Sequence, residues 1–210
     1  MKKLLFFGDS ITDMCRQRTS NGLPYELGFG HVFIITAELK TKFPNQYQIV
    51  NSGISGNRSV DLFDRYEEDV IKEKPDVLTI LIGVNDVWHA LIGNGVSLKK
   101  YKEVCSSMIK DIKAKLPNIT IIVLEPFMLK GEATIDNYEH FEKVFKYARA
   151  IRKNAKDNDC YFVPLQKPME KEIARGVDSK DILYDGVHPN IVGINLIARE
   201  WLKTFKKISK

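Results

Sequence analysis

The sequence is poor in cysteine and has no long run of apolar residues. Its three cysteines, Cys15, Cys105 and Cys160, are odd in number and form no C-x-x-C pair, so neither a disulfide framework nor a thiolate metal site is indicated. No apolar run approaches the roughly 18 residues that cross a membrane. The four apolar residues at 4–7 are too few for the core of a signal peptide. We therefore expect three reduced thiols and a cytoplasmic protein, with a signal peptide removed before residue 1 as the alternative.

Charge of one sign is also scarce outside the C-terminal end. The chain holds 32 Lys and Arg against 27 Asp and Glu, a net charge of +5, and its last twelve residues contribute five basic side chains and one acidic one. A nucleic-acid surface needs basic residues spread over a folded face, whereas this excess is typical of the solvated side of a terminal helix. With 44% hydrophobic and 28% charged residues, the composition predicts one globular domain over residues 1–210 that binds neither nucleic acid nor a membrane.

Short apolar runs alternate with longer stretches of helical period, which predicts an α/β fold of βα units around a parallel sheet. Five runs are predicted to be strands: 4–7, 47–50, 77–82, 119–124 and 161–163. Five stretches are predicted to be helices: 30–42, 61–73, 98–116, 138–151 and 194–208. The connections 85–97 and 125–136 show no clear period, and loops of this size beside a sheet often bind substrate.

Polar motifs follow three of the predicted strands. The first strand runs into Gly-Asp-Ser-Ile-Thr-Asp at 8–13, the second into Asn-Ser-Gly-Ile-Ser-Gly-Asn at 51–57, and the third into Gly-Val-Asn-Asp at 83–86. A fourth motif, Asp-Gly-Val-His-Pro at 185–189, lies near the C-terminus. Parallel strands place their carboxyl ends at one edge of the sheet, where α/β proteins bind their ligands. We therefore expect all four motifs to meet there.

These motifs contain the parts needed for acyl transfer. A serine hydroxyl needs a base to take its proton, and the base needs a carboxylate that fixes its tautomer; Ser10, His188 and Asp185 can supply these roles. Asp185 and His188 are three residues apart, so a single turn can pair them. The negative oxygen of the tetrahedral intermediate needs hydrogen-bond donors. The backbone N–H groups of Ser10 and Gly53 and the side-chain amide of Asn85 are the predicted donors.

The four motifs together resemble the GDSL family of esterases and lipases in its SGNH hydrolase form. That form is named for a Ser, a Gly, an Asn and a His, here Ser10, Gly53, Asn85 and His188. The usual Leu of the family is Ile11 in this sequence, which leaves the chemistry unchanged. The resemblance implies a three-layer, flavodoxin-like fold with five parallel strands between helices.

A finer resemblance is to the carbohydrate-acetylesterase branch that includes intracellular acetylxylan esterases. It lies in residues 83–88, residues 53–57 and the acidic run 67–71. The resemblance implies a serine esterase without cofactor that removes acetyl groups from xylan-derived oligosaccharides. A thioesterase or lysophospholipase and a non-catalytic sugar-binding module of the same fold are the alternatives. The expected partner is a small-molecule or oligosaccharide ester, and assembly into a homo-oligomer stays open.

Further residues are assigned from their place in the sequence. Three side chains are candidates for substrate contact: Trp88, His89 and Tyr25. Trp88 could instead fill the core, or stack on a sugar ring. Asp9, His31 and His140 are predicted to be structural or solvated rather than catalytic. Because no histidine and carboxylate cluster has the spacing of metal ligands, no metal is expected.

Overall fold

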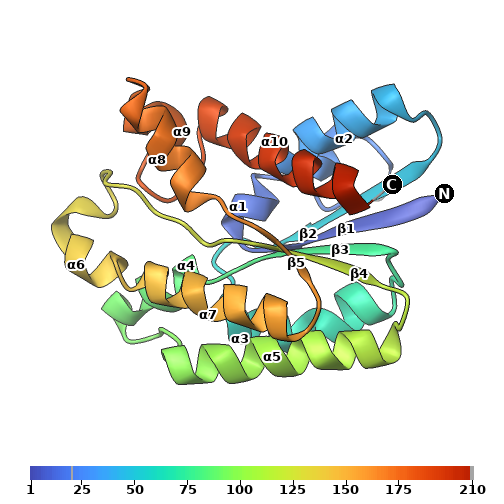
Figure 1. Cartoon of the computed structure of the whole chain (residues 1–210), viewed down its shortest axis with the longest axis horizontal. Helices are drawn as coiled ribbons and strands as arrows, with labels where there is room; N and C mark the ends of the chain where they lie inside the picture. Colours follow the sequence, from blue (N-terminus) through green and yellow to red (C-terminus); the bar gives the residue numbers. More distant parts are fainter. Residues whose placement is uncertain (20, 209–210) are drawn as a thin grey trace.

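A five-stranded parallel sheet forms the centre of the computed structural model, which describes residues 1–19 and 21–208 (Figure 1). The strands follow one another in the spatial order β2-β1-β3-β4-β5. Their bounds are β1 Lys2–Gly8, β2 Tyr47–Gly53, β3 Val77–Leu81, β4 Thr120–Leu124 and β5 Tyr161–Val163. All five predicted strands are confirmed. This strand order is that of flavodoxin-like sheets, whose ligands bind where the order reverses, between β1 and β3.

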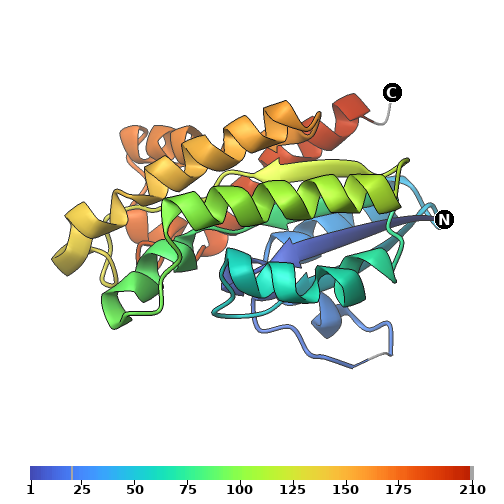
Figure 2. The same ribbon diagram turned by 90° about the horizontal axis from the view of Figure 1, so that it is seen from below.

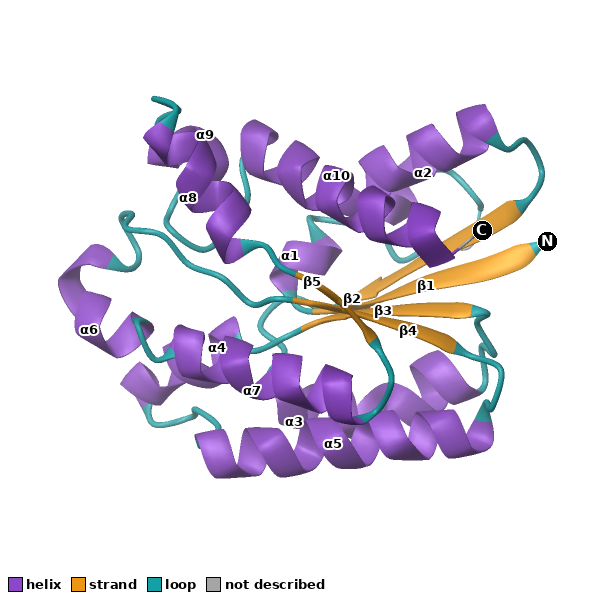
Figure 3. Cartoon of the chain, in the orientation of Figure 1, coloured by secondary structure: helices purple, strands orange, loops and turns teal. Residues whose placement is uncertain are grey.

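Helices cover both faces of the sheet, which makes the predicted three layers (Figures 1 and 3). One face carries α2 His31–Lys42, α8 Gln166–Ala174, α9 Ser179–Ile182 and α10 Ile191–Ile208. The other carries α3 Ser59–Tyr66, α5 Leu98–Lys115 and α7 Val144–Asp157. On this second face α5 packs against both α3 and α7, and Figure 2 shows these helices from outside the sheet. No helix in the described ranges is long and apolar enough to cross a membrane.

Several short elements differ from the predictions. They are α1 Ser10–Asp13, α4 Val84–Trp88 and α6 Tyr138–Phe141, the 3-10 turns Pro24–Leu27, His89–Ile92 and Ile135–Asn137, and the π turn Glu67–Ile71. The expected loop 85–97 thus contains a helix and a 3-10 turn, because one-turn helices are too short to show a period. The predicted helix 138–151 is interrupted between α6 and α7. Helix α8 was not predicted because it buries only Gln166 and Met169 and has no apolar stripe.

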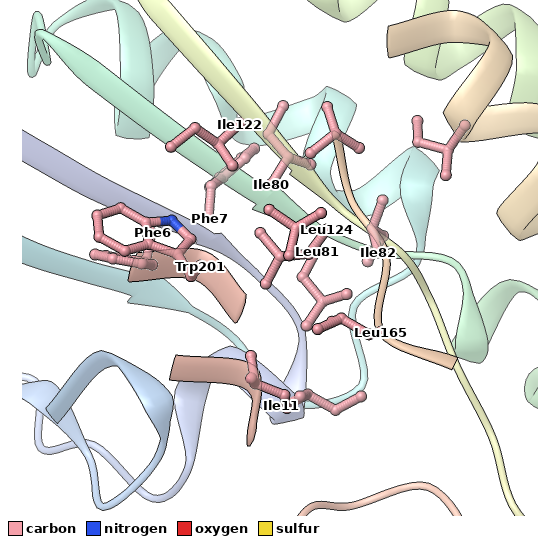
Figure 4. Close-up of a cluster of buried hydrophobic side chains, with 14 of the residues drawn as sticks. Phe6, Phe7, Ile11, Ile80, Leu81, Ile82, Ile122, Leu124, Leu165 and Trp201 are labelled. Atoms are coloured by element: carbon pink, nitrogen blue, oxygen red, sulfur yellow. The ribbon is translucent and has the colours of Figure 1, made fainter. Parts of the chain in front are cut away.

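The core joins the first strand to the last helix. The residues of β1 from Leu4 to Phe7 are almost completely buried, as a central strand covered on both faces requires. Trp201 of α10 is fully buried against Phe6, with 5.4 Å between the ring centroids (Figure 4). Its indole N–H donates to Thr79 Oγ1 of β3 at 2.9 Å, so the polar end of this large side chain is also satisfied.

The carboxyl ends of the central strands are level with one another. Gly8 at the end of β1 pairs with Gly53 of β2 on one side and with Leu81 of β3 on the other. The segments that follow these three residues therefore leave the sheet side by side. This register brings the first three polar motifs together, as the sequence predicts.

Candidate active site

Ser10 is presented by a short helix that begins where β1 ends. Asp9 caps α1, since its Oδ1 atom accepts from the backbone N–H of Ile11 at 3.0 Å. The next residues, Ile11 to Asp13, are buried and fix the helix, while Ser10 keeps partial exposure. The structural role predicted for Asp9 is confirmed. Burial raises the pKa of its carboxyl group to about 7, and its Oδ2 atom has no partner among the described residues.

His188 and Asp185 lie in one tight turn between α9 and α10. The Oδ1 atom of Asp185 accepts from the backbone N–H groups of Val187 at 2.8 Å and His188 at 2.7 Å. Its Oδ2 atom accepts from Nδ1 of the His188 ring at 2.6 Å. A single isolated bridge between Leu183 and Pro189 closes the turn. The three-residue spacing thus pairs the two side chains as predicted.

The pair faces Ser10. With Nδ1 of His188 donating to Asp185, Nε2 is the acceptor for the Ser10 hydroxyl, and the two atoms are 2.9 Å apart. The hydrogen bond from Asp185 raises the pKa of His188 above its ordinary value, against the effect of burial. Burial alone would raise the pKa of Asp185, but its hydrogen bonds with His188 and the turn backbone outweigh this and lower the pKa. The arrangement gives an ionised carboxylate, an imidazole with a raised pKa and a hydroxyl within hydrogen-bond distance of that imidazole.

Gly53 ends β2 at the predicted edge of the sheet, but its N–H is not available as an oxyanion donor. Its N–H donates to the side chain of Asn51 at 2.9 Å, and a Cβ at Gly53 would come within 2.2 Å of the backbone nitrogen of Asp13. Gly53 is therefore packed under α1 with its donor already used, and the oxyanion role predicted for it is wrong. The glycine that faces the site is Gly56, in the turn after β2. Among the described residues no acceptor is found for its N–H, and its φ of 84° favours glycine.

Asn85 lies in the first turn of α4 and is almost fully buried. One N–H of its side-chain amide donates to the carbonyl oxygen of Asn57 at 3.0 Å, which leaves the other for a ligand. The neighbouring Asp86 accepts from the N–H and the hydroxyl of Ser59, so α4 is tied to the start of α3. Burial raises the pKa of Asp86 to about 6.

These groups open into a cavity of about 620 Å³ at the carboxyl edge of the sheet. Its lining includes Ser10, Gly56, Asn85 and His188. Its remaining wall is mostly apolar and aromatic: Met14, Cys15, Phe29, Ser55, Trp88, His89, Leu91, Ile92 and Tyr184. Trp88 and His89 therefore lie where substrate contact was predicted. Tyr25 does not line this cavity; it lies on the 3-10 turn Pro24–Leu27.

Tyr184 is a site residue that the sequence analysis missed. Its ring is half-exposed and stacks on the ring of His188, with 5.6 Å between centroids and an interplanar angle of 14°. On another side Trp88 approaches the same imidazole, at 5.9 Å between centroids. The position of Tyr184 directly before Asp185 is the sequence signal that could have identified it. No group of three or more His, Cys, Asp or Glu residues in the described ranges is arranged to hold a metal ion.

Comparison with known proteins identifies the family to which this chain belongs. The chain belongs to the GDSL-like lipase/acylhydrolase family, whose sequence model matches residues 6–193, and it is a carboxylic ester hydrolase. It is 33% identical to an acetylxylan esterase of Geobacillus stearothermophilus over 209 residues, 96% of this chain and 93% of that protein.

Solved structures give the same result. A putative GDSL-like lipase from Parabacteroides merdae matches with a TM-score of 0.90 and 35% identity over 97% of this chain and 94% of that one. The structure of the Geobacillus acetylxylan esterase matches with a TM-score of 0.84 and 33% identity, over 97% and 93% of the two chains.

Proposed function

We propose that this esterase removes O-acetyl groups from xylo-oligosaccharides through Ser10, His188 and Asp185. The observation that supports it best is the continuous set of hydrogen bonds from Asp185 through His188 to Ser10, at 2.6 and 2.9 Å, beside a cavity that Ser10 and His188 line. In the acetylxylan esterase of Geobacillus stearothermophilus, alanine variants at a serine, an aspartate and a histidine are described as catalytic mutants. That aspartate and histidine are three positions apart, as Asp185 and His188 are here.

The mechanism follows from this geometry. Nε2 of His188 takes the proton of the Ser10 hydroxyl while Oγ bonds to the ester carbonyl carbon, and the carbonyl oxygen becomes negative. Asp185 stabilises the imidazolium that forms. When the intermediate collapses, the carbon–oxygen bond to the sugar breaks and the sugar oxygen takes the proton from His188. Water then attacks the acetyl-enzyme with His188 as base, which releases acetate and restores Ser10.

Three donors are available for the negative oxygen: the backbone N–H groups of Ser10 and Gly56 and the free amide hydrogen of Asn85. Each comes from a segment that follows a different strand, β1, β2 or β3. Such donors act by being fixed in place before the charge develops. Gly56 replaces Gly53 in this role, because its N–H is free and it borders the same cavity as Ser10.

The cavity wall supports a sugar as the alcohol part of the ester. Trp88, Tyr184 and Phe29 line it, and their rings offer flat apolar faces of the kind that pack on pyranose rings. The same wall also contains the exposed apolar side chains Leu91 and Ile92. This observation favours a second candidate function, hydrolysis of esters or thioesters with longer acyl chains.

The test is acetate release from acetylated xylo-oligosaccharides, with p-nitrophenyl acetate and octanoate in parallel, by the native protein and the Ser10→Ala variant. We expect release from both acetyl substrates, little turnover of octanoate, and an inert variant. A rate that rises from acetate to octanoate would favour the second candidate function, hydrolysis of esters with longer acyl chains. If p-nitrophenyl acetate is cleaved but no acetate is released from the xylo-oligosaccharides, the serine mechanism is supported and the proposed substrate is wrong. No turnover and no labelling of Ser10 by a fluorophosphonate would indicate a binding module.

A further inference from the structure

One arginine outside the cavity contacts two of the three segments that supply the oxyanion donors, and a neighbour of the third. Arg65 of α3 donates from Nη2 to the carbonyl oxygen of Gly8 at 3.1 Å and from Nη1 to that of Ser52 at 3.0 Å. Its Nε donates to the side-chain oxygen of Asn57 at 2.8 Å. A single guanidinium therefore joins the carboxyl ends of β1 and β2 to the turn that follows β2.

The side chain of Arg65 is itself firmly held. It forms an ion pair with Asp69, in the π turn that follows α3, and its guanidinium lies over the ring of Phe7 at 4.3 Å from the centroid. Only 15% of the side chain is exposed. A partly buried guanidinium with several fixed acceptors loses little freedom on binding each one, because its donors form a rigid planar fork.

Each acceptor of Arg65 is close in sequence to a donor. Gly8 is two residues before Ser10, and Asn57 directly follows Gly56. The backbone carbonyl of Asn57 also accepts the amide of Asn85 at 3.0 Å. The contacts of Arg65 therefore reach the segments of Ser10 and Gly56 directly, and that of Asn85 through Asn57.

We propose that Arg65 is a positioning residue that keeps the three oxyanion donors aimed at one point. The inference rests on the proposed function, since it assigns Arg65 a task within that mechanism. Arg65 acts through Gly8, Ser52 and Asn57 and touches no substrate atom. A misplacement of about 1 Å in such a site can cost on the order of a hundredfold in rate.

The positioning role of Arg65 can be tested separately from the role of His188 as the base. None of the hydrogen bonds of Arg65 in the described structure reaches His188 or Asp185, which belong to the turn before α10. Loss of Arg65 should therefore weaken stabilisation of the tetrahedral intermediate and leave the protonation of His188 unchanged.

The experiment compares Arg65→Gln and Arg65→Lys with the native enzyme on p-nitrophenyl acetate. Rates are expressed per active site, titrated with a fluorophosphonate, so that unfolded protein does not count. We expect kcat to fall about a hundredfold in Arg65→Gln and about tenfold in Arg65→Lys, which keeps the charge but not the fork. KM should change little, and the acid limb of the pH profile should not move. Affinity for phenylboronic acid, which forms a tetrahedral adduct with a serine, should fall in parallel with kcat/KM.

Two further variants make the result specific. Arg152→Gln is the matched control, because Arg152 also lies over a strand aromatic, Phe162, but makes no hydrogen bond to a donor segment among the described residues; its kcat should stay within twofold. In Arg65→Gln combined with Asn85→Ala, the combined loss should be smaller than the product of the single losses, since both changes act on one set of donors.

The proposal is overturned if kcat per titrated site of Arg65→Gln stays within threefold of native, if boronate affinity is unchanged, or if the two losses multiply. Ser10→Ala, whose rate is expressed per total folded protein because it has no serine to titrate, separates this from the proposed function. If that variant remains active, the serine mechanism itself is wrong. If it is inert while Arg65→Gln is fully active, only the positioning role fails.

Discussion

Replacing Asp185 with Asn tests the link between the turn geometry and catalysis. An asparagine can still accept from the backbone N–H groups of Val187 and His188 through Oδ1, so the turn should be kept. Its Nδ2 group would then face Nδ1 of His188, where the native carboxylate oxygen lies at 2.6 Å. A donor at that position forces Nδ1 to become an acceptor. The proton then moves to Nε2, which can no longer accept from Ser10.

The wrong tautomer should lower kcat about ten-thousandfold, which corresponds to roughly 5 kcal/mol of transition-state stabilisation. The pH profile gives a second readout. The reaction needs neutral His188, and the hydrogen bond to Asp185 raises the pKa of this residue. As the pH is lowered, the native rate should therefore decrease with a midpoint above the ordinary pKa of about 6.5. Without the carboxylate, the acid limb should move to lower pH.

The assay is hydrolysis of p-nitrophenyl acetate from pH 4.5 to 9, with circular dichroism to confirm folding. The matched control is Asp178→Asn, because Asp178 caps α9 at the surface and asparagine caps equally well. It should keep native activity and melting temperature. A loss below tenfold in Asp185→Asn, with the acid limb in its native place, would refute the role assigned to this turn.

Three further changes test other parts of the structure. Asn85→Ala should lower kcat a hundred- to thousandfold with KM nearly unchanged, and a folded variant that loses less than threefold would exclude Asn85 as an oxyanion donor. His31 is buried with a pKa near 4, set by desolvation, whereas the unfolded chain takes up this proton below about 6.5, so roughly 3 kcal/mol of stability should disappear as pH falls from 6.5 to 4. Urea unfolding of His31→Leu should show a weaker dependence on pH over that range, and an identical slope would contradict the lowered pKa of His31. Trp201→Ala should cost about 3 to 5 kcal/mol in urea unfolding, and a cost below 1 kcal/mol would show that α10 contributes little to the core.

The sheet and the main helices could be predicted because each gives a long, regular signal. Strands buried on both faces are continuous apolar runs, and α5 and α10 show apolar residues at helical spacing over eighteen residues each. The short helices α1 and α4 give no such signal, because their formation depends on caps and on burial against strand ends. Asp9 is an example, since its capping bond is visible only once the direction of the chain after β1 is known.

The candidate site was predictable in its chemistry and only partly in its geometry. Ser10, Asp185 and His188 follow from residue types, order and spacing, and the structure places them in contact. The choice between Gly53 and Gly56 could not be made from spacing alone, because both lie in one motif after β2. It depends on which glycine α1 covers: a Cβ at Gly53 would meet the backbone of Asp13, whereas one at Gly56 would meet nothing within 4 Å. Tyr25 was misplaced for a similar reason, since no periodic pattern fixes the direction of the segment after α1.

The hydrogen bond between Ser10 and His188 joins residues 178 positions apart in the chain. During synthesis, the strand that precedes the serine leaves the ribosome well before the turn that holds the histidine. Every intermediate in between therefore has a nucleophile without its base. Since α10 anchors that turn through Trp201 on β1 and β3, recovery of esterase activity after dilution from urea should require α10 to pack on the sheet. In a refolding experiment, helical circular dichroism should return before the ability to cleave an ester.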